Sequence, residues 1–317
     1  MSISRLLSEV LVLGCVACLV AGGAEEKAKP KATIGVSMLT LANPFFVKMG
    51  EAMTEEAAKR GMQVVLTAGE FDATKQKNQV GDFIVKRVDA IILCPCDSKA
   101  VGTSIAEATK AGIPVFTADI ACVAQGAKVV CHIATDNYSG GKEAGKAMIE
   151  ALGGTGKVAI LDHPEVESVM LRTKGFEEEI DKHNKAGGKI EIVAKLPGGG
   201  AKDKSFKTME DILQTHPNLN GVFCSNDPSA LGAVAALEKA GKIAQVKVVG
   251  FDGMPEGKQA IKAGKIYADP IQFPEKIGQQ AIQAIVKYMA GDDVAPQILI
   301  PTALYRKADA EKDPELK

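Results

Sequence analysis

The sequence predicts an α/β protein built from two doubly wound lobes, each with a parallel sheet covered by helices on both faces. After the first 30 residues, apolar strand-like runs alternate with amphipathic helical patterns along the whole chain. About ten such strands are more than one doubly wound sheet holds comfortably in a chain of 317 residues. Two sheets are therefore expected.

The first half of the chain contains the alternation from which the first sheet is predicted. Its first helix repeats apolar residues on one side, at Phe46, Met49, Met53 and Ala57. The elements expected here are strand 33–40, helix 44–60, strand 63–67, helix 74–88, strand 90–94, helix 98–111, strand 114–118 and strand 128–133.

The second half repeats the scheme, with glycines near several helix ends, where a left-handed residue commonly stops a helix. The elements expected here are helix 140–152, strand 158–161, helix 167–185, strand 190–194, helix 205–215, strand 221–224, helix 229–241, strand 246–250, helix 255–264 and strand 266–270. In open α/β sheets, ligands bind beyond the carboxyl ends of the strands. Polar residues directly after strands are therefore the first candidates for a site.

Residues 1–30 are predicted to be an export signal and a tether. Arg5 precedes a short apolar core at 10–20, and small residues at 21–24 suit cleavage by a peptidase. Lipid attachment at Cys15 or Cys18 stays open, as does the alternative of an ordinary buried N-terminal helix. A periplasmic or otherwise extracytoplasmic location is expected.

Five cysteines follow the signal, at positions 94, 96, 122, 131 and 224. Export permits a disulfide, and Cys122 with Cys131 could close a short loop between two strands. Alternatively, all five are small buried apolar residues. Because neither a CxxC redox pair nor a zinc spacing occurs, no metal and no cofactor are expected.

Charge and motif content exclude several classes of function. The 38 basic residues balance 39 acidic ones, whereas binding to nucleic acid usually requires a basic excess, so no nucleic-acid partner is expected. After the N-terminus no apolar run approaches the ~20 residues of a membrane helix. The sequence contains no GxSxG, no HExxH and no phosphate-binding loop, and no catalytic constellation is found.

Five loops that follow predicted strands each supply an amide or a carboxylate. These residues are Asn43, Asp119, Asn226, Asp252 and Gln272, and two phenyl rings, Phe45 and Phe46, lie beside the first. Carboxylates accept hydrogen bonds, and amides both donate and accept, so the set suits a ligand rich in hydroxyl groups. The phenyl rings offer flat apolar faces for the C–H surface of a sugar.

Each of these polar residues also has a purely structural interpretation. Asn43 before Pro44 is a good helix N-cap, and Asp119 and Asp252 suit turns or caps. Taken singly, each residue is more often structural. Five coincidences at the expected ends of strands favour a binding site.

These residues occur in segments that resemble the ribose-binding protein family of bacterial periplasmic binding proteins. The resemblance extends from about residue 32 to residue 307, and its most specific segments are 42–46 (ANPFF), 114–119 (PVFTAD), 132–137 (HIATDN), 225–233 (SNDPSALGA) and 249–253 (VGFDG). It implies two α/β lobes, crossovers near 135–136, 272–273 and 301–302, and a sugar held between the lobes.

The resemblance also implies the division of the chain between the lobes. The N-terminal lobe is expected to comprise 31–135 plus 273–300, and the C-terminal lobe 136–272 plus 301–308. Residues 309–317 are expected to form a charged tail.

By the same resemblance, sugar contacts are expected from Asn43, Phe45, Phe46, Asp119, Asn226, Asp252 and Gln272, which all keep the family's residue types. Four positions depart. Ile120 stands where an arginine is expected. A second arginine falls at Met170, with Arg172 two residues later. Cys94 replaces an asparagine, and Gly200 lies near an expected phenylalanine.

Arginine supplies charge-assisted hydrogen bonds, so its loss changes the choice of ligand. The expected ligand is a neutral pentose, hexose or polyol other than ribose. The expected function is that of the solute-binding component of an ABC importer, a monomer that closes on its ligand by a hinge motion and docks on the importer's membrane subunits.

Other functions remain open at this level. A periplasmic sugar sensor for a signalling receptor would share the same features. A carbohydrate-active enzyme could use Asp119 and Asp252 as an acid and a base. A sugar-responsive repressor would need a basic helix-turn-helix where the export-like segment lies.

Overall fold

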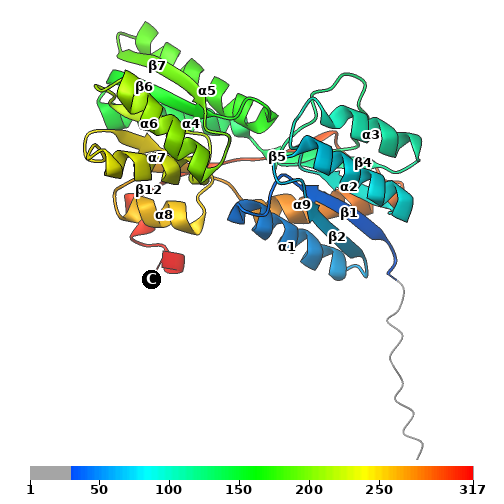
Figure 1. The fold of residues 1–317 in the computed structure, drawn as a ribbon. Coiled ribbons are helices and arrows are strands. Elements are labelled where there is room, and N and C mark those ends of the chain that lie inside the picture. Colours follow the sequence, from blue (N-terminus) through cyan, green and yellow to red (C-terminus); the bar gives the residue numbers. More distant parts are fainter. Residues whose placement is uncertain (1–29, 317) are drawn as a thin grey trace, which may run out of the picture.

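The computed structural model describes residues 30–316. The predicted export signal, including Cys15 and Cys18, lies outside the described residues. Two lobes lie side by side, and each is built around its own six-stranded sheet (Figure 1). This arrangement confirms the predicted fold class.

The sheet of the first lobe has all its neighbouring strands parallel. In spatial order its strands are β11 (Gln297–Ile300), β5 (His132–Thr135), β4 (Val115–Ala118), β3 (Ala90–Leu93), β1 (Thr33–Met38) and β2 (Gln63–Ala68). Apolar side chains alternate between its two faces, as the strand period requires. Helices α1 (Pro44–Ala58) and α9 (Pro274–Ala290) cover one face, and α2 (Ala73–Lys86) and α3 (Val101–Lys110) cover the other.

The sheet of the second lobe follows the same plan. In spatial order its strands are β12 (Ala303–Arg306), β10 (Ala268–Ile271), β9 (Lys247–Val249), β8 (Gly221–Cys224), β6 (Thr155–Asp162) and β7 (Lys189–Pro197). Helices α4 (Asn137–Leu152) and α5 (Glu167–Lys185) cover one face. Helices α6 (Lys202–Thr215), α7 (Asp227–Lys239) and α8 (Pro255–Lys262) cover the other.

The chain crosses between the two sheets three times, after β5, after β10 and after β11. The third crossing makes β12 antiparallel to β10, an exception to the predicted parallel sheets. Strand β11 ends facing the other lobe, and only Pro301 and Thr302 separate it from β12. Strand β12 therefore enters its sheet from the end at which the parallel strands finish, and it runs the opposite way.

Several elements differ from the sequence-based expectation. Helix α9 and strands β11 and β12 were outside the predicted set, although α9 carries Ile277, Ala281 and Ile285 at helical spacing. The strand expected over 128–133 begins only at His132, because β4 pairs with β5 only from that residue onward.

The segment expected to be a charged tail packs against the second lobe. It contains the end of α10 (Lys307–Ala310) and the 3-10 helix η1 (Pro314–Leu316). Ala310 is buried in the core of that lobe, and Lys258 of α8 pairs with Asp313 at 3.0 Å. Burial of Ala310 and this ion pair hold the segment in place.

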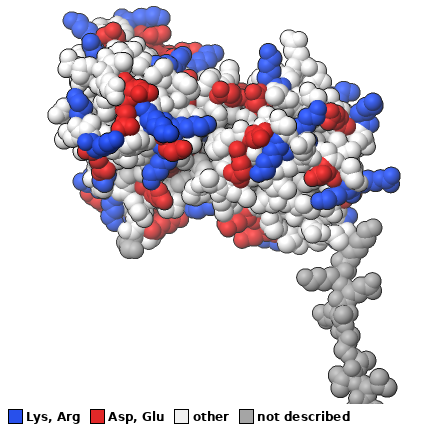
Figure 2. All heavy atoms as spheres, in the orientation of Figure 1, with Lys and Arg blue, Asp and Glu red and all other residues white. Residues whose placement is uncertain are grey.

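The molecular surface carries charges of both signs. On the face shown in Figure 2, basic and acidic side chains are intermixed over both lobes. This mixture agrees with the near-zero net charge of the whole sequence. Within residues 30–316, no helix has the length and apolar content needed to cross a bilayer.

Candidate functional site

A pocket lies between the lobes, at the carboxyl ends of the strands. Both lobes contribute to its walls. The lining residues are Leu39, Thr40, Asn43, Phe45, Phe46, Phe71, Asp119, Ile120, His163, Val166, Ser168, Val169, Arg172, Gly200, Asn226, Asp252 and Gln272. All seven residues predicted to contact the ligand are among them, together with Ile120 and Arg172.

Asn43 serves as both a helix cap and a pocket residue. Its side-chain Oδ1 accepts a hydrogen bond from the Phe45 amide at 3.0 Å and caps α1. Its Nδ2 is thereby directed across the cleft, 3.5 Å from Oδ2 of Asp252. Phe45 and Phe46, in the first turn of that helix, are both buried, and their rings meet edge to face with centroids 5.2 Å apart.

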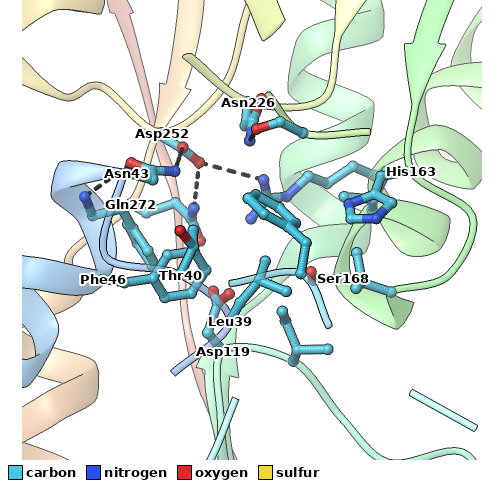
Figure 3. A pocket seen from close by; sticks show the side chains of 17 residues that line it. Leu39, Thr40, Asn43, Phe46, Asp119, His163, Ser168, Asn226, Asp252 and Gln272 are labelled. Atoms are coloured by element: carbon cyan, nitrogen blue, oxygen red, sulfur yellow. Dashed lines mark hydrogen bonds and ion pairs between the residues drawn. The ribbon is translucent and has the colours of Figure 1, made fainter. Parts of the chain in front are cut away.

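Asp252 is the centre of the polar network in the pocket (Figure 3). Its Oδ1 accepts hydrogen bonds from Nε2 of Gln272 at 2.6 Å and from the Arg172 guanidinium at 3.3 Å. Burial raises the pKa of the Asp252 carboxyl, and the charge of Arg172 opposes that shift. The network joins Asn43 of the first lobe to Asp252 and Arg172 of the second lobe and to Gln272 at the crossing segment.

Arg172 is held on every side by the second lobe. Its Nε donates to Oδ1 of Asn137 at 2.7 Å, and its Nη1 donates to the Ser225 carbonyl at 2.7 Å. The guanidinium lies over the Phe251 ring, 3.9 Å from the centroid. Of the described side chains that line the pocket, Arg172 alone carries a permanent positive charge. It is the residue that offsets the buried carboxylates.

Asp119 directly follows β4 and has no comparable partner. Burial raises the pKa of its carboxyl to about 7, although Arg172 acts in the opposite direction. Its Oδ1 is buried without a hydrogen-bond partner among the described residues. This acceptor lies in the pocket, available to a ligand that donates a hydrogen bond.

Both pocket aspartates adopt left-handed backbone conformations, with φ of 64° at Asp119 and 107° at Asp252. Such conformations are uncommon for residues other than glycine and cost of order 1–3 kcal/mol. In each case the loop directs a carboxylate into the pocket rather than along the strand. Conformations of this kind cluster at functional sites.

The wall near Asn226 is built differently from the expectation based on the resemblance. Gly200 lies where a phenylalanine was expected, but a Cβ there would come within 3.2 Å of the His163 ring. His163 and Phe71 occupy this space from opposite lobes, with ring centroids 6.0 Å apart. Asn226 caps α7 through Oδ1, and its Nδ2 donates to the Gly200 carbonyl at 3.0 Å. The pocket therefore keeps an aromatic wall.

Two of the four positions that depart from the family pattern, Cys94 and Met170, do not line the pocket. Cys94 is fully buried in the first lobe, with its Sγ 3.5 Å from the Met38 sulfur. Met170 is half exposed on α5 and does not line the pocket. Arg172, two residues later on the same helix, is buried and does line it. The second-lobe arginine is thus present, and of the two expected arginines only the one replaced by Ile120 is missing.

Several lining residues were not identified from the sequence. Thr40 closely follows the end of β1, so a search for polar residues just after strands could have found it. Phe71, His163 and Ser168 lie in loops or at the start of a helix, and of these His163 directly follows strand β6. The aliphatic lining residues carry no sequence signal that separates them from core residues. They are Leu39, Val166 and Val169.

The five described cysteines are free thiols, so Cys122 and Cys131 are not bridged in this structure. Burial raises the pKa of the Cys131 thiol to about 11. Between residues 30 and 316, no cluster of three or more histidine, cysteine, aspartate or glutamate side chains is suited to hold a metal ion.

Comparison with known proteins gives a consistent result. A family model described as "Periplasmic binding protein domain" matches residues 34–293. The ribose import binding protein of Bacillus subtilis is 37% identical over 87% of this chain and 88% of its own length. The D-apiose import binding protein of Paraburkholderia graminis is 34% identical over 85% of this chain and 86% of its own length.

Solved structures agree with the sequence relatives. A periplasmic solute-binding protein of an ABC transporter from Actinobacillus succinogenes, with bound D-allose, has a TM-score of 0.81 at 30% identity and covers 90% of this chain and 100% of its own. The Caulobacter myo-inositol binding protein, bound to myo-inositol, has a TM-score of 0.82 at 26% identity, with 91% and 99% covered. The chain belongs to the family of periplasmic binding protein domains.

Proposed function

We propose that this chain is the solute-binding component of an ABC importer and that its inter-lobe pocket binds a neutral monosaccharide or polyol without turnover. One observation carries the proposal: amides and carboxylates of both lobes converge with two phenyl rings on one buried pocket. Planar polar side chains hold hydroxyl groups, and phenyl faces hold the C–H surface of a sugar ring. Relatives named as sugar import binding proteins support the same assignment.

The proposal extends to location and partners. The export-like segment at the N-terminus supports secretion to the periplasm, with or without a lipid at Cys15 or Cys18. The expected partners are the sugar and the membrane subunits of the importer, with the binding protein acting as a monomer. Neither a metal nor a cofactor takes part in this function.

A thermal-shift screen of the protein against pentoses, hexoses and polyols tests the proposed function. A specific ligand at a hundredfold excess over its Kd should stabilise the folded protein by about 2.7 kcal/mol, because it binds only the folded state. The melting temperature should rise for a few related compounds, and calorimetric titration should then give saturation at one site. If every compound in the panel leaves the melting temperature unchanged, the proposal is wrong.

We also propose that ligand binding closes two rigid bodies, which comprise 31–135 plus 273–300 and 136–272 plus 301–308. Because residues 309–316 pack on α8, they should move with the second body. A ligand that contacts both lobes binds the closed form more tightly and shifts the hinge equilibrium toward it. Direct contacts between the lobes stabilise the same closed form.

Ser98 makes two of these contacts. It lies in the loop before α3, where its backbone amide donates to the Glu165 carbonyl at 2.9 Å and its Oγ accepts from the Glu167 amide at 2.9 Å. Replacing Ser98 by alanine should weaken ligand affinity roughly two- to tenfold, because one net hydrogen bond of the closed state is lost.

Calorimetric titration of the Ser98→Ala variant measures this effect. Ser104→Ala is the matched control, since Ser104 is equally buried but lies within α3 of the same lobe. The control should keep the affinity of the parent protein. An unchanged affinity in Ser98→Ala would show that this contact does not contribute to closure.

A further inference from the structure

Asp252 and the amides bonded to it form one polar part of the pocket, and the Asp119 carboxylate lies apart from them. Figure 3 shows Asn226 and Asp252 on one side of the pocket, and Leu39 with Asp119 on the opposite side. Each of three pocket amides donates one hydrogen bond to a protein acceptor. Asn43 and Gln272 donate to Asp252, and Asn226 donates to Gly200.

Four aliphatic side chains also line the pocket, and we call them the aliphatic wall: Leu39, Ile120, Val166 and Val169. All four residues are buried, and all belong to a single apolar cluster. Two come from the first lobe and two from the second, so the wall forms only where the lobes meet. These side chains offer no hydrogen-bonding atom to a ligand.

A hydroxyl group placed against this wall would lose its bonds to water and gain none from these side chains. A methyl or methylene group at the same place would instead be removed from water, which is favourable. Asp119, the chain neighbour of Ile120, supplies an unpartnered acceptor next to the wall. It can receive a hydroxyl on the next carbon of the ligand.

We propose that the ligand is a sugar or polyol with one deoxygenated edge, a methyl or methylene group that contacts the aliphatic wall while its remaining hydroxyls face Asp119, Asp252 and Gln272. This inference rests on the proposed function and narrows it. It makes Val169 and its three neighbours in the wall determinants of specificity.

Calorimetric titration with pairs of sugars that differ by one hydroxyl tests the inference. Suitable pairs are L-fucose with L-galactose, L-rhamnose with L-mannose, and 2-deoxy-D-ribose with D-ribose. In at least one pair the deoxy member should bind about tenfold or more tightly than its hydroxylated partner, which corresponds to one unmade hydrogen bond.

Val169→Thr provides a second test, because threonine has nearly the shape of valine and adds a hydroxyl to the wall. The preference for the deoxy sugar should fall about tenfold or more in this variant. Val234→Thr is the matched control: Val234 is also helical and is 5% exposed against 6% for Val169, but it lies in the core of the second lobe. That control should keep the preference of the parent protein.

The outcomes separate this inference from the proposed function. If sugars bind but the hydroxylated member is equal or better in every pair, the deoxygenated edge is wrong while the importer function stands. An unchanged preference in Val169→Thr would also overturn the role of the wall. If neither these pairs nor the wider panel of pentoses, hexoses and polyols binds, the proposed function is wrong and this inference falls with it.

Discussion

Replacing Arg172 by methionine is expected to lower the free energy of unfolding by about 3–5 kcal/mol and to abolish sugar binding. The guanidinium is buried, lies 3.3 Å from Asp252, and satisfies Asn137 and the Ser225 carbonyl. Without it, the Asp252 carboxylate stays buried with no cation beside it. Removing one partner of a buried ion pair lowers stability by far more than the net contribution of the whole pair. The reason is that the other charge stays buried without compensation.

Urea unfolding of the unliganded protein measures this loss. Lys174→Met is the matched control, since Lys174 lies on the same helix but is 63% exposed, 3.9 Å from Glu178. An exposed pair of this kind contributes at most about 1 kcal/mol. In the double variant Arg172→Met with Asp252→Asn, part of the loss should be recovered, because no buried carboxylate then needs a cation at that position.

A loss below about 1 kcal/mol in Arg172→Met would contradict the role assigned to this residue. If the single variant does not fold, Arg172→Lys keeps the charge while losing the fork of donors. That variant should retain most of the stability and lose ligand affinity. Equal affinity for Arg172→Lys and the parent protein would show that the fork does not position Asp252 for the ligand.

Replacing Asp119 by asparagine is expected to have opposite effects on stability and on binding. At pH 8 the unliganded variant should be more stable than the parent protein by roughly 2–4 kcal/mol, since each unit of pKa shift corresponds to about 1.4 kcal/mol. Ligand affinity should fall about ten- to hundredfold, because a neutral amide accepts weaker hydrogen bonds than a carboxylate.

The pH dependence identifies the cause of this stabilisation. Burial raises the pKa of Asp119 from 3.8 to about 7 in the folded protein. Between these values the folded state keeps a proton that the unfolded state has released, so stability falls as pH rises from about 4 through about 7. Below pH 4 both states are protonated. The gain in free energy of unfolding of Asp119→Asn over the parent protein should therefore be small at pH 4 and reach its full size near pH 8.

Urea unfolding of both proteins across this range gives the difference directly. Asp82→Asn is the control, because Asp82 is exposed on α2 of the same lobe. It should change stability by less than about 0.5 kcal/mol at any pH. A pH-independent difference between Asp119→Asn and the parent protein would show that the Asp119 carboxyl does not titrate with a raised pKa.

The positions of the polar site residues were predictable because parallel strands end at a common edge. Asn43, Asp119 and Asp252 each come directly after a strand or within a few residues of one, so the order of elements alone brings them to the cleft. The sequence also posed the alternative of a helix cap for Asn43. The structure shows both roles, because an amide can cap the helix with its oxygen and leave its nitrogen for the pocket.

The resemblance was less reliable where a pocket side chain comes from a neighbouring helix position or from a distant loop. It placed an expected arginine at Met170 and an expected phenylalanine near Gly200. Helix α5 turns Arg172 inward, and His163 with Phe71 fills the space at Gly200. A shift of two residues on a helix, or a ring supplied by a distant loop, leaves no trace in a local motif. Only the packed structure resolves such substitutions.

The sequence by itself determined the two α/β lobes and the polar residues of the cleft. Strand and helix periods, and the direction of parallel strands, are local properties that each segment carries in its own residues. Only the tertiary structure decided which buried carboxylate has a cation beside it, and which aliphatic side chains of the core also line the pocket. Both depend on distances between segments far apart in the chain, such as Arg172 from Asp252 and Leu39 from Val169. Burial and charge compensation act through those distances.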